Sequence, residues 1–233
     1  MIKNKNILII GGSSGIGLAL ADLLSSSNNI YIASRSSDNL SGLNAHHITF
    51  DATSEILDTS LLPEKLDGFV YCPGSINLRP FKGLSVEAFE KDFQINVTGA
   101  INSLKNVLGN LGASGNASIV FFSTVAVQTG MPFHSSVAAS KGAIEGLTRS
   151  LAAEFAPKIR VNAIAPSLVN TPLASKFLNN DTKLEKANER HPLGRIGSAK
   201  EIAQATAFLL GEESSWMTGR VLQLDGGIGN LKT

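Results

Sequence analysis

The chain has 233 residues, of which 43% are hydrophobic and 17% charged, and its formal net charge is +1 at pH 7. This length allows one large domain or two small ones, and the composition is that of a globular α/β protein with a sizeable core. A near-neutral charge without a basic block argues against nucleic acid or an anionic membrane as a partner.

Cysteine usage and the amino-terminal region point to a compartment. Cys72 is the only cysteine, so an internal disulfide is excluded, as expected in a reducing environment. The first apolar run ends at Gly11 and is too short for a signal peptide core or a membrane span. We therefore expect a soluble, cytoplasmic protein. His46 and His47 are adjacent and would face opposite sides of a strand, so we expect no metal site.

The first patterned stretch of the chain predicts a strand, a turn and a helix. Residues 7–10 are apolar and mostly β-branched, which is typical of a buried strand. The turn that follows carries Gly11, Gly15 and Gly17, and apolar residues at helical spacing begin with Ile16. The glycines therefore lie where the strand passes into the helix.

This turn is suited to binding phosphate. A helix N-terminus has unpaired N–H groups and a partial positive charge, and glycines let a pyrophosphate come close to the backbone. Ser13 and Ser14 add hydroxyl donors. The spacing differs from G-x-G-x-x-G, so it predicts a variant of the dinucleotide site. The alternative is a plain glycine-rich turn.

The second strand, predicted at residues 30–33, ends beside Arg35. In dinucleotide folds, the residue about 20 positions beyond the glycines meets the adenosine ribose, and an acid there accepts from the 2′-hydroxyl of NAD. This chain has Ser34 and Arg35 instead, with no acid before Asp38. A guanidinium suits a 2′-phosphate because it can bind bidentately. NADP(H) is therefore preferred over NAD(H); the alternative is a solvated surface arginine.

Strands and helices alternate along the rest of the chain. Further strands are predicted at residues 47–50, 68–72, 118–122, 159–164 and 221–224, and helices at residues 85–107, 140–155 and 198–210. This alternation predicts one Rossmann-like domain over residues 1–233, a doubly wound parallel sheet of about seven strands covered by helices on both faces. Ligands bind at the carboxyl ends of such strands. Those ends, which we expect to line one crevice, are Gly11, Arg35, Asp51, Gly74, Ser123 with Thr124, and Pro166.

Two helices and one segment carry further signals. Asn96 lies in mid-helix beside an apolar stripe, where asparagine is a poor helix former, so it is a candidate for a buried polar role. Small residues open the helix predicted at 140–155 and allow close approach of a ligand or another helix. Residues 173–191 are polar and weakly patterned, and we expect a mobile lid over a substrate at about residues 173–195.

Several motifs together resemble those of the short-chain dehydrogenase/reductase family over nearly the whole chain. The glycine turn is similar to the family's cofactor motif, and Asp51 to its adenine-contacting aspartate. Asn96 resembles its active-site asparagine, and residues 138–141 (AASK) resemble the end of its Y-x-x-x-K motif. Residues 160–166 (RVNAIAP) and 217–227 (MTGRVLQLDGG) are similar to its carboxyl-terminal signatures.

The resemblance implies hydride transfer between a nicotinamide and a carbonyl or alcohol. In the family a tyrosine donates the proton, a lysine lowers the pKa of that tyrosine and holds the ribose, a serine holds the substrate oxygen, and an asparagine helps to hold a water relay. By resemblance Lys141, Thr124 and Asn96 take the last three roles. Val137 stands where the tyrosine is expected, and valine cannot donate a proton. The cofactor-binding residues implied are Gly11, Ser13, Ser14, Gly15, Ile16, Gly17, Arg35, Asp51, Gly74, Lys141, Pro166 and Thr171.

The missing tyrosine leaves three hypotheses open. The chain is an atypical NADP-dependent reductase with another proton donor, a non-catalytic NADP(H)-binding sensor or structural partner, or a reductase of acceptors that need no enzymic donor. His134 lies one helical turn before Val137 and has a suitable unperturbed pKa, although we expect it to be a solvent-exposed loop residue. The resemblance also implies a homodimer or homotetramer, with the helices at 85–107 and 140–155 packed across a two-fold axis.

Overall fold

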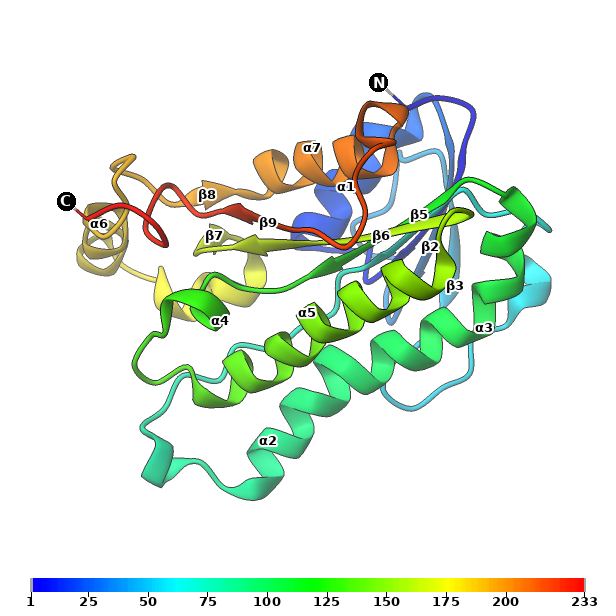
Figure 1. Cartoon of the computed structure of the whole chain (residues 1–233). Coiled ribbons are helices and arrows are strands. Elements are labelled where there is room, and N and C mark those ends of the chain that lie inside the picture. Colours follow the sequence, from blue (N-terminus) through cyan, green and yellow to red (C-terminus); the bar gives the residue numbers. More distant parts are fainter. Residues whose placement is uncertain (1, 233) are drawn as a thin grey trace.

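The computed structural model describes residues 2–232 and shows a seven-stranded parallel sheet between two layers of helices (Figure 1). The strand order is β3-β2-β1-β4-β5-β6-β9, and every neighbouring pair is parallel. This doubly wound Rossmann-like arrangement confirms the predicted fold class. The strands are β1 (Asn6–Ile10), β2 (Asn29–Ser34), β3 (Ala45–Thr49), β4 (Gly68–Tyr71), β5 (Ala117–Phe122), β6 (Ile159–Pro166) and β9 (Val221–Leu224).

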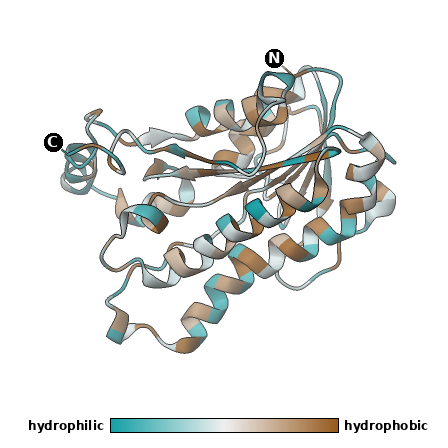
Figure 2. Ribbon diagram, in the orientation of Figure 1, coloured by the Kyte–Doolittle hydropathy of each residue, from teal (hydrophilic) through white to brown (hydrophobic). Residues whose placement is uncertain are grey.

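Each face of the sheet buries its own apolar layer. Helices α1 (Gly15–Ser25) and α7 (Ala199–Leu210) cover one face, and α3 (Gly99–Ser114) and α5 (Ser135–Phe155) cover the other (Figure 1). The central strands are strongly hydrophobic, while polar residues gather on the outer helix faces (Figure 2). Strands buried on both sides read as continuous apolar runs, and for this reason the sequence predicts them well.

The helix predicted at residues 85–107 is interrupted. The chain forms α2 (Val86–Phe93), a π-helical turn (Gln94–Thr98) and then α3. π-Turns are rare and often occur at functional sites. The side chain of Asn96 is completely buried in this turn, in line with the expected buried polar role. The Tyr71 hydroxyl donates to the Ile95 carbonyl at 2.7 Å and ties β4 to the same turn.

Two predicted segments differ in the structure. Helix α5 begins at Ser135, five residues before the predicted start, because Ser136 and Ser140 are stabilised by tertiary hydrogen bonds that local propensity does not reveal. The segment predicted as a weakly patterned lid contains a 3-10 helix (Pro172–Phe177) and helix α6 (Asp181–Glu189). The Asn180 side chain caps α6 by accepting from the Lys183 amide at 2.9 Å, a start signal that the sequence carried.

Short elements complete the chain on either side of residues 171–196. Strands β7 (Val169–Asn170) and β8 (Gly197–Ser198) pair in parallel and bring the two ends of this segment together. Helix α4 (Ala126–Thr129) follows β5. Within residues 2–232, no helix has the length and apolar character needed to cross a membrane.

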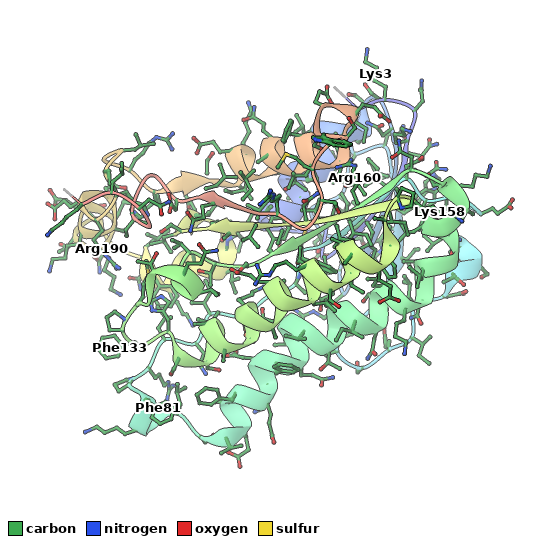
Figure 3. All side chains as sticks on the ribbon, in the orientation of Figure 1. Lys3, Phe81, Phe133, Lys158, Arg160 and Arg190 are labelled. Atoms are coloured by element: carbon green, nitrogen blue, oxygen red, sulfur yellow. The ribbon has the colours of Figure 1, made fainter. Side chains whose placement is uncertain are left out.

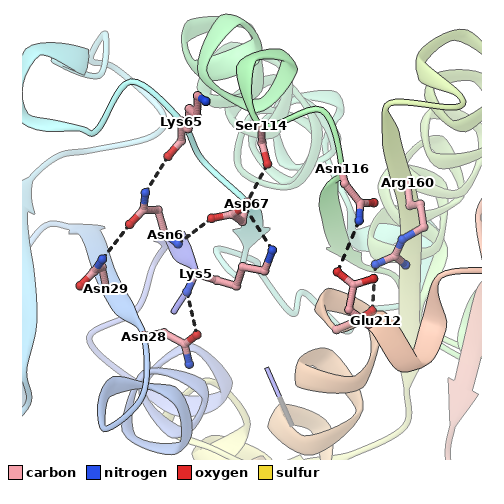
Figure 4. A network of polar contacts seen from close by, with 11 residues as sticks. Lys5, Asn6, Asn28, Asn29, Lys65, Asp67, Ser114, Asn116, Arg160 and Glu212 are labelled. Carbon is pink, nitrogen blue, oxygen red and sulfur yellow. Dashed lines mark hydrogen bonds and ion pairs between the residues drawn. The ribbon is translucent and has the colours of Figure 1, made fainter. Parts of the chain in front are cut away.

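The amino ends of the strands are joined by a polar network centred on Asp67 (Figure 4). Its carboxylate accepts from the Asn6 amide at 2.9 Å and from the Ser114 hydroxyl at 3.0 Å, and Lys5 lies 3.5 Å away. Asp67 thereby connects β1, β4 and the end of α3. The polar groups at this end are occupied in joining secondary structure, whereas the opposite ends of the strands surround a cavity.

Candidate functional site

The glycine turn is tightly folded and leaves the start of α1 open. Gly11 and Gly15 have φ values of +76° and +53°, in the left-handed region that favours glycine. A Cβ atom on Gly17 would collide with the carbonyl oxygen of Gly11, so the helix can approach the turn only without a side chain there. Thr171, from beyond β6, comes within 3.5 Å of where a Gly15 Cβ would stand.

The ends of β2 and β3 form the adjoining part of the site. Arg35 is exposed, and its positive charge contributes to lowering the pKa of Asp51, although hydrogen bonds from Thr53 to that carboxylate lower it more. The Thr53 hydroxyl donates to Asp51 Oδ1 at 2.6 Å. The Asn39 amide donates to the Ser13 carbonyl at 3.0 Å, so the segment after β2 folds over the glycine turn. Arg35 and Asp51, which were predicted from separate parts of the sequence, therefore lie close enough to interact, and the segment after β2 contacts the glycine turn.

A cavity of about 470 Å³ lies at the carboxyl ends of the central strands. It brings together half of the predicted site residues, while Asn96 is fully buried and does not line it. The other predicted residues that do not line it are Gly11, Ser13, Ser14, Gly15, Gly17, Arg35 and Asp51. The predicted residues on its wall are Ile16, Gly74, Thr124, His134, Val137, Lys141, Pro166 and Thr171. Among residues 2–232 no group of three or more His, Cys, Asp and Glu side chains is placed to hold a metal ion.

Lys141 is a buried cation at the wall of this cavity. Only 7% of its surface is exposed, and burial lowers its pKa to about 8, against the opposing influence of Cys72 and Asp92. A Cβ atom on Gly74 would lie 3.6 Å from Lys141 Nζ and 3.3 Å from Asn96 Oδ1. The absence of a side chain at residue 74 therefore leaves room beside both groups. An amine with a pKa near neutrality can donate and accept protons.

Behind Lys141 lies a buried polar group that the sequence analysis did not identify, here called the Asp92 cluster: Ser75, Asp92, Asn96, Ser136 and Ser140. The hydroxyls of Ser75 and Ser136 donate to the two carboxylate oxygens of Asp92 at 2.6 and 2.5 Å. Asn96 Nδ2 donates to Ser75 Oγ at 3.0 Å and to Ser140 Oγ at 3.2 Å. Asp92 is 3% exposed, and hydroxyl donors partner its carboxylate within the cluster.

The sequence did contain a signal for the Asp92 cluster. Asp92 stands four residues before Asn96, and both positions adjoin the apolar stripe of the predicted helix, so their side chains fall near one another on its inner side. Ser136 and Ser140 repeat the same four-residue spacing on α5. Only the tertiary structure shows that these two faces meet, since α2 and α5 lie side by side (Figure 1).

Val137 is 5% exposed and contributes a hydrocarbon surface to the cavity wall. The neighbouring hydroxyls are differently placed. Ser123 and Thr124 both line the cavity, but Ser123 is buried and its hydroxyl donates to Glu145 Oε1 at 2.8 Å, whereas Thr124 is half-buried. Thr124 therefore offers the hydroxyl that a bound substrate could reach.

Two histidines also line the cavity. His134 precedes α5 and is half-buried, which differs from the solvent-exposed loop position expected for it; its Nδ1 lies 2.7 Å from the Pro132 carbonyl. His191, which the sequence analysis did not single out, is buried, with Nδ1 2.7 Å from the Ala187 carbonyl and Nε2 2.9 Å from Ser167 Oγ. A carbonyl accepts from Nδ1–H, so Nε2 of His191 is left to accept from Ser167.

Comparisons with known proteins identify similar sequences and structures. Residues 44–229 match the family described as Enoyl-(Acyl carrier protein) reductase. A 2,5-dichloro-2,5-cyclohexadiene-1,4-diol dehydrogenase of Sphingobium indicum is 34% identical over 243 residues, which cover 97% of each chain.

Solved structures give the same result at the level of the fold. An actinorhodin polyketide ketoreductase solved with NADPH has a TM-score of 0.90 and 26% identity, and the match covers 98% of both chains. ElxO with NADP bound has a TM-score of 0.87 and 27% identity, over 97% of this chain and 98% of that one.

Proposed function

The chain belongs to the short-chain dehydrogenase/reductase family of oxidoreductases, and on that premise we propose that it transfers hydride between NADP(H) and a carbonyl or alcohol at a site without the family's tyrosine. The observation that carries the proposal is the shared cavity wall. Lys141 and Thr124 line the same cavity as Ile16 of the glycine turn, and this cavity is large enough for a small substrate.

The residues present fit a nicotinamide dinucleotide phosphate. Gly17 lets α1 pack directly against the backbone of the glycine turn, because any Cβ there would collide with the Gly11 carbonyl, and the start of the helix then lies at the turn where a pyrophosphate is expected. Arg35 is free of a close carboxylate partner among residues 2–232 and suits a 2′-phosphate. Two similar structures were solved with NADPH or NADP. When bound, the nicotinamide supplies or accepts the hydride.

We assign the proton to Lys141 in place of the missing tyrosine. In reduction, the substrate carbon receives hydride and its oxygen receives a proton from the Lys141 ammonium, giving the alcohol and a neutral amine. The Thr124 hydroxyl donates a hydrogen bond to the same oxygen. Positioned proton transfer of this kind contributes about 10²–10⁴-fold to a rate.

The Asp92 cluster supports this role of Lys141. The Asp92 carboxylate raises the pKa of the lysine against the effect of burial, so the ammonium form persists near neutral pH. A Cys72 thiolate would act in the same direction, but burial raises the pKa of this thiol to about 12, so it is uncharged near neutral pH. His134 faces the same cavity. Asn96 and Ser75 span the space between the carboxylate and the wall at Gly74.

The test is NADPH consumption by the purified protein with a panel of ketones, aldehydes and quinones, measured beside Val137→Tyr and Val137→Phe. The phenylalanine variant adds the ring without the hydroxyl and is the matched control. Wild-type turnover supports the proposal, and loss of that turnover in Lys141→Met with NADPH binding retained supports the proton assignment.

Other outcomes contradict the proposal. Activity in Val137→Tyr alone, with a silent wild type and a silent Val137→Phe, would favour a non-catalytic NADP(H)-binding protein. Turnover restricted to quinones, unchanged in Lys141→Met, would favour acceptors that need no enzymic proton donor.

A further inference from the structure

We propose that the substrate of this site carries an anionic group, a carboxylate or a phosphate ester, which binds to cations of the lid while its carbonyl end enters the apolar part of the cavity. This inference rests on the proposed oxidoreductase function and names the class of substrate. Its basis is the distribution of charge around the cavity.

Helix α6 separates its charges onto two faces. Lys183, Lys186 and Arg190 follow one another at three- and four-residue spacing, and all three line the cavity. Asp181, Glu185 and Glu189 repeat every four residues and do not line it. Residues three and four apart share one face of a helix, so α6 turns a cationic face toward the cavity and an acidic face away from it.

The cavity wall adds a fourth lid cation and no acid. Lys176 lines the cavity and donates from Nζ to the Ile76 carbonyl at 2.7 Å, which ties the lid to the loop after β4. Among residues 2–232, no aspartate or glutamate lines the cavity, and none of the four lid cations forms an ion pair. Four cations without a carboxylate partner make the mouth of the cavity attractive to an anion.

Other residues of the cavity wall are apolar. Met131, Val137, Leu168 and Phe177 contribute apolar surface, and valine in place of tyrosine adds to it. These four side chains are buried or half-buried, whereas Lys183, Lys186 and Arg190 are exposed. An apolar interior with a cationic rim matches a molecule that has an uncharged, carbonyl-bearing body and one anionic end. The cofactor's pyrophosphate is expected at the glycine turn, where the start of α1 provides its own donors.

The experiment measures binding to the protein saturated with NADP⁺, so that the cofactor's own phosphates are constant. The probes are matched pairs: 4-oxopentanoate and 4-oxodecanoate against their methyl esters, and dihydroxyacetone phosphate against dihydroxyacetone. Dissociation constants are measured by titration calorimetry at low and high salt. The variant is the triple substitution Lys183→Gln, Lys186→Gln, Arg190→Gln, and the control is Lys158→Gln, at the opposite end of the sheet from Arg190 (Figure 3).

We expect the anionic member of a pair to bind at least about tenfold more tightly, with the preference decreasing as salt increases. The triple variant should lose this preference, and the Lys158 variant should keep it. A preference confined to the oxo acids identifies a carboxylate, and one confined to the phosphate pair identifies a phosphate ester.

Equal binding within every pair, no binding of any probe, or an unchanged preference in the triple variant would overturn the inference. A failure of the proposed function would give a different result. In that case an oxo acid would still bind more tightly than its ester, but no carbonyl compound would cause the oxidation of NADPH.

Discussion

Substitution of Asp92 by asparagine tests whether a buried charge sets the protonation of Lys141. Asparagine has nearly the same shape and keeps an oxygen that accepts from one of the two hydroxyls, Ser75 or Ser136, while its amide nitrogen faces the other and can donate to it. The substitution removes the negative charge that raises the lysine's pKa. For scale, Coulomb's law gives about 1.7 kcal/mol, or about one pKa unit, for two unit charges at a separation on the order of 10 Å and an effective dielectric constant of about 20. We therefore expect the pKa of Lys141 to fall from about 8 to roughly one unit lower.

The sign of the effect on catalysis follows from the direction of the reaction. Carbonyl reduction requires the ammonium, so kcat should fall as pH rises through the pKa of Lys141, and this limb should move to lower pH in Asp92→Asn. With a shift of about one unit, the protonated fraction at about pH 7.5 drops roughly threefold, while the rate well below both pKa values is unchanged. Alcohol oxidation requires the neutral amine and should show the opposite trend.

The assay is the pH profile of kcat for NADPH oxidation, measured alongside NADPH affinity. Ser136→Ala is the matched control, because it removes a hydrogen bond to the same carboxylate but keeps the charge. An Asp92→Asn profile that superimposes on the wild-type profile, with NADPH affinity retained, would refute the assignment of the proton to Lys141.

Three other predictions concern the cofactor site and the core. Arg35→Ala should weaken NADPH binding by about 10–100-fold and leave NADH binding unchanged, since charge-assisted hydrogen bonds contribute about 1.5–3 kcal/mol; fluorescence titration with both cofactors checks this. Gly17→Ala should abolish detectable NADPH binding in the same titration and destabilise the fold by about 1–3 kcal/mol, because the new methyl group meets the Gly11 carbonyl. Phe69→Ala should lower the free energy of unfolding by about 3–5 kcal/mol in denaturant titrations, since Phe69 is fully buried with its ring centroid 6.4 Å from that of Phe121; a loss below 1 kcal/mol would contradict this packing argument.

Local sequence patterns were sufficient to predict the strands of the sheet and the glycine turn of the expected cofactor site. Residues 7–10 and 119–122 are continuous apolar runs because both faces of a central parallel strand are buried, and such runs are visible without any knowledge of contacts. The glycine turn is equally local, since strand, turn and helix follow one another directly. These elements could be predicted because their physical causes lie within a few residues of one another.

The start of α5 and the form of the lid could not be predicted with the same accuracy. Ser135 and Ser136 have weak helix propensity, and only a partner in α2, Asp92, fixes Ser136 in the helix. Helix α6 is polar on nearly every position, so it shows no apolar stripe; its pattern is one of charge, with cations toward the cavity and acids away from it. The Asn180 N-cap of α6 could have been predicted from the sequence, but the sequence analysis did not identify it.

The sequence alone determined the parallel sheet, the order of its motifs and the valine at position 137, because each depends on residue types at short spacing. Only the tertiary structure decided what surrounds that valine. It placed the Asp92 carboxylate behind Lys141, brought His134 and His191 to the cavity, and turned the cations of α6 toward it. These contacts join residues tens of positions apart, and their energies depend on burial and charge that exist only after the chain has folded.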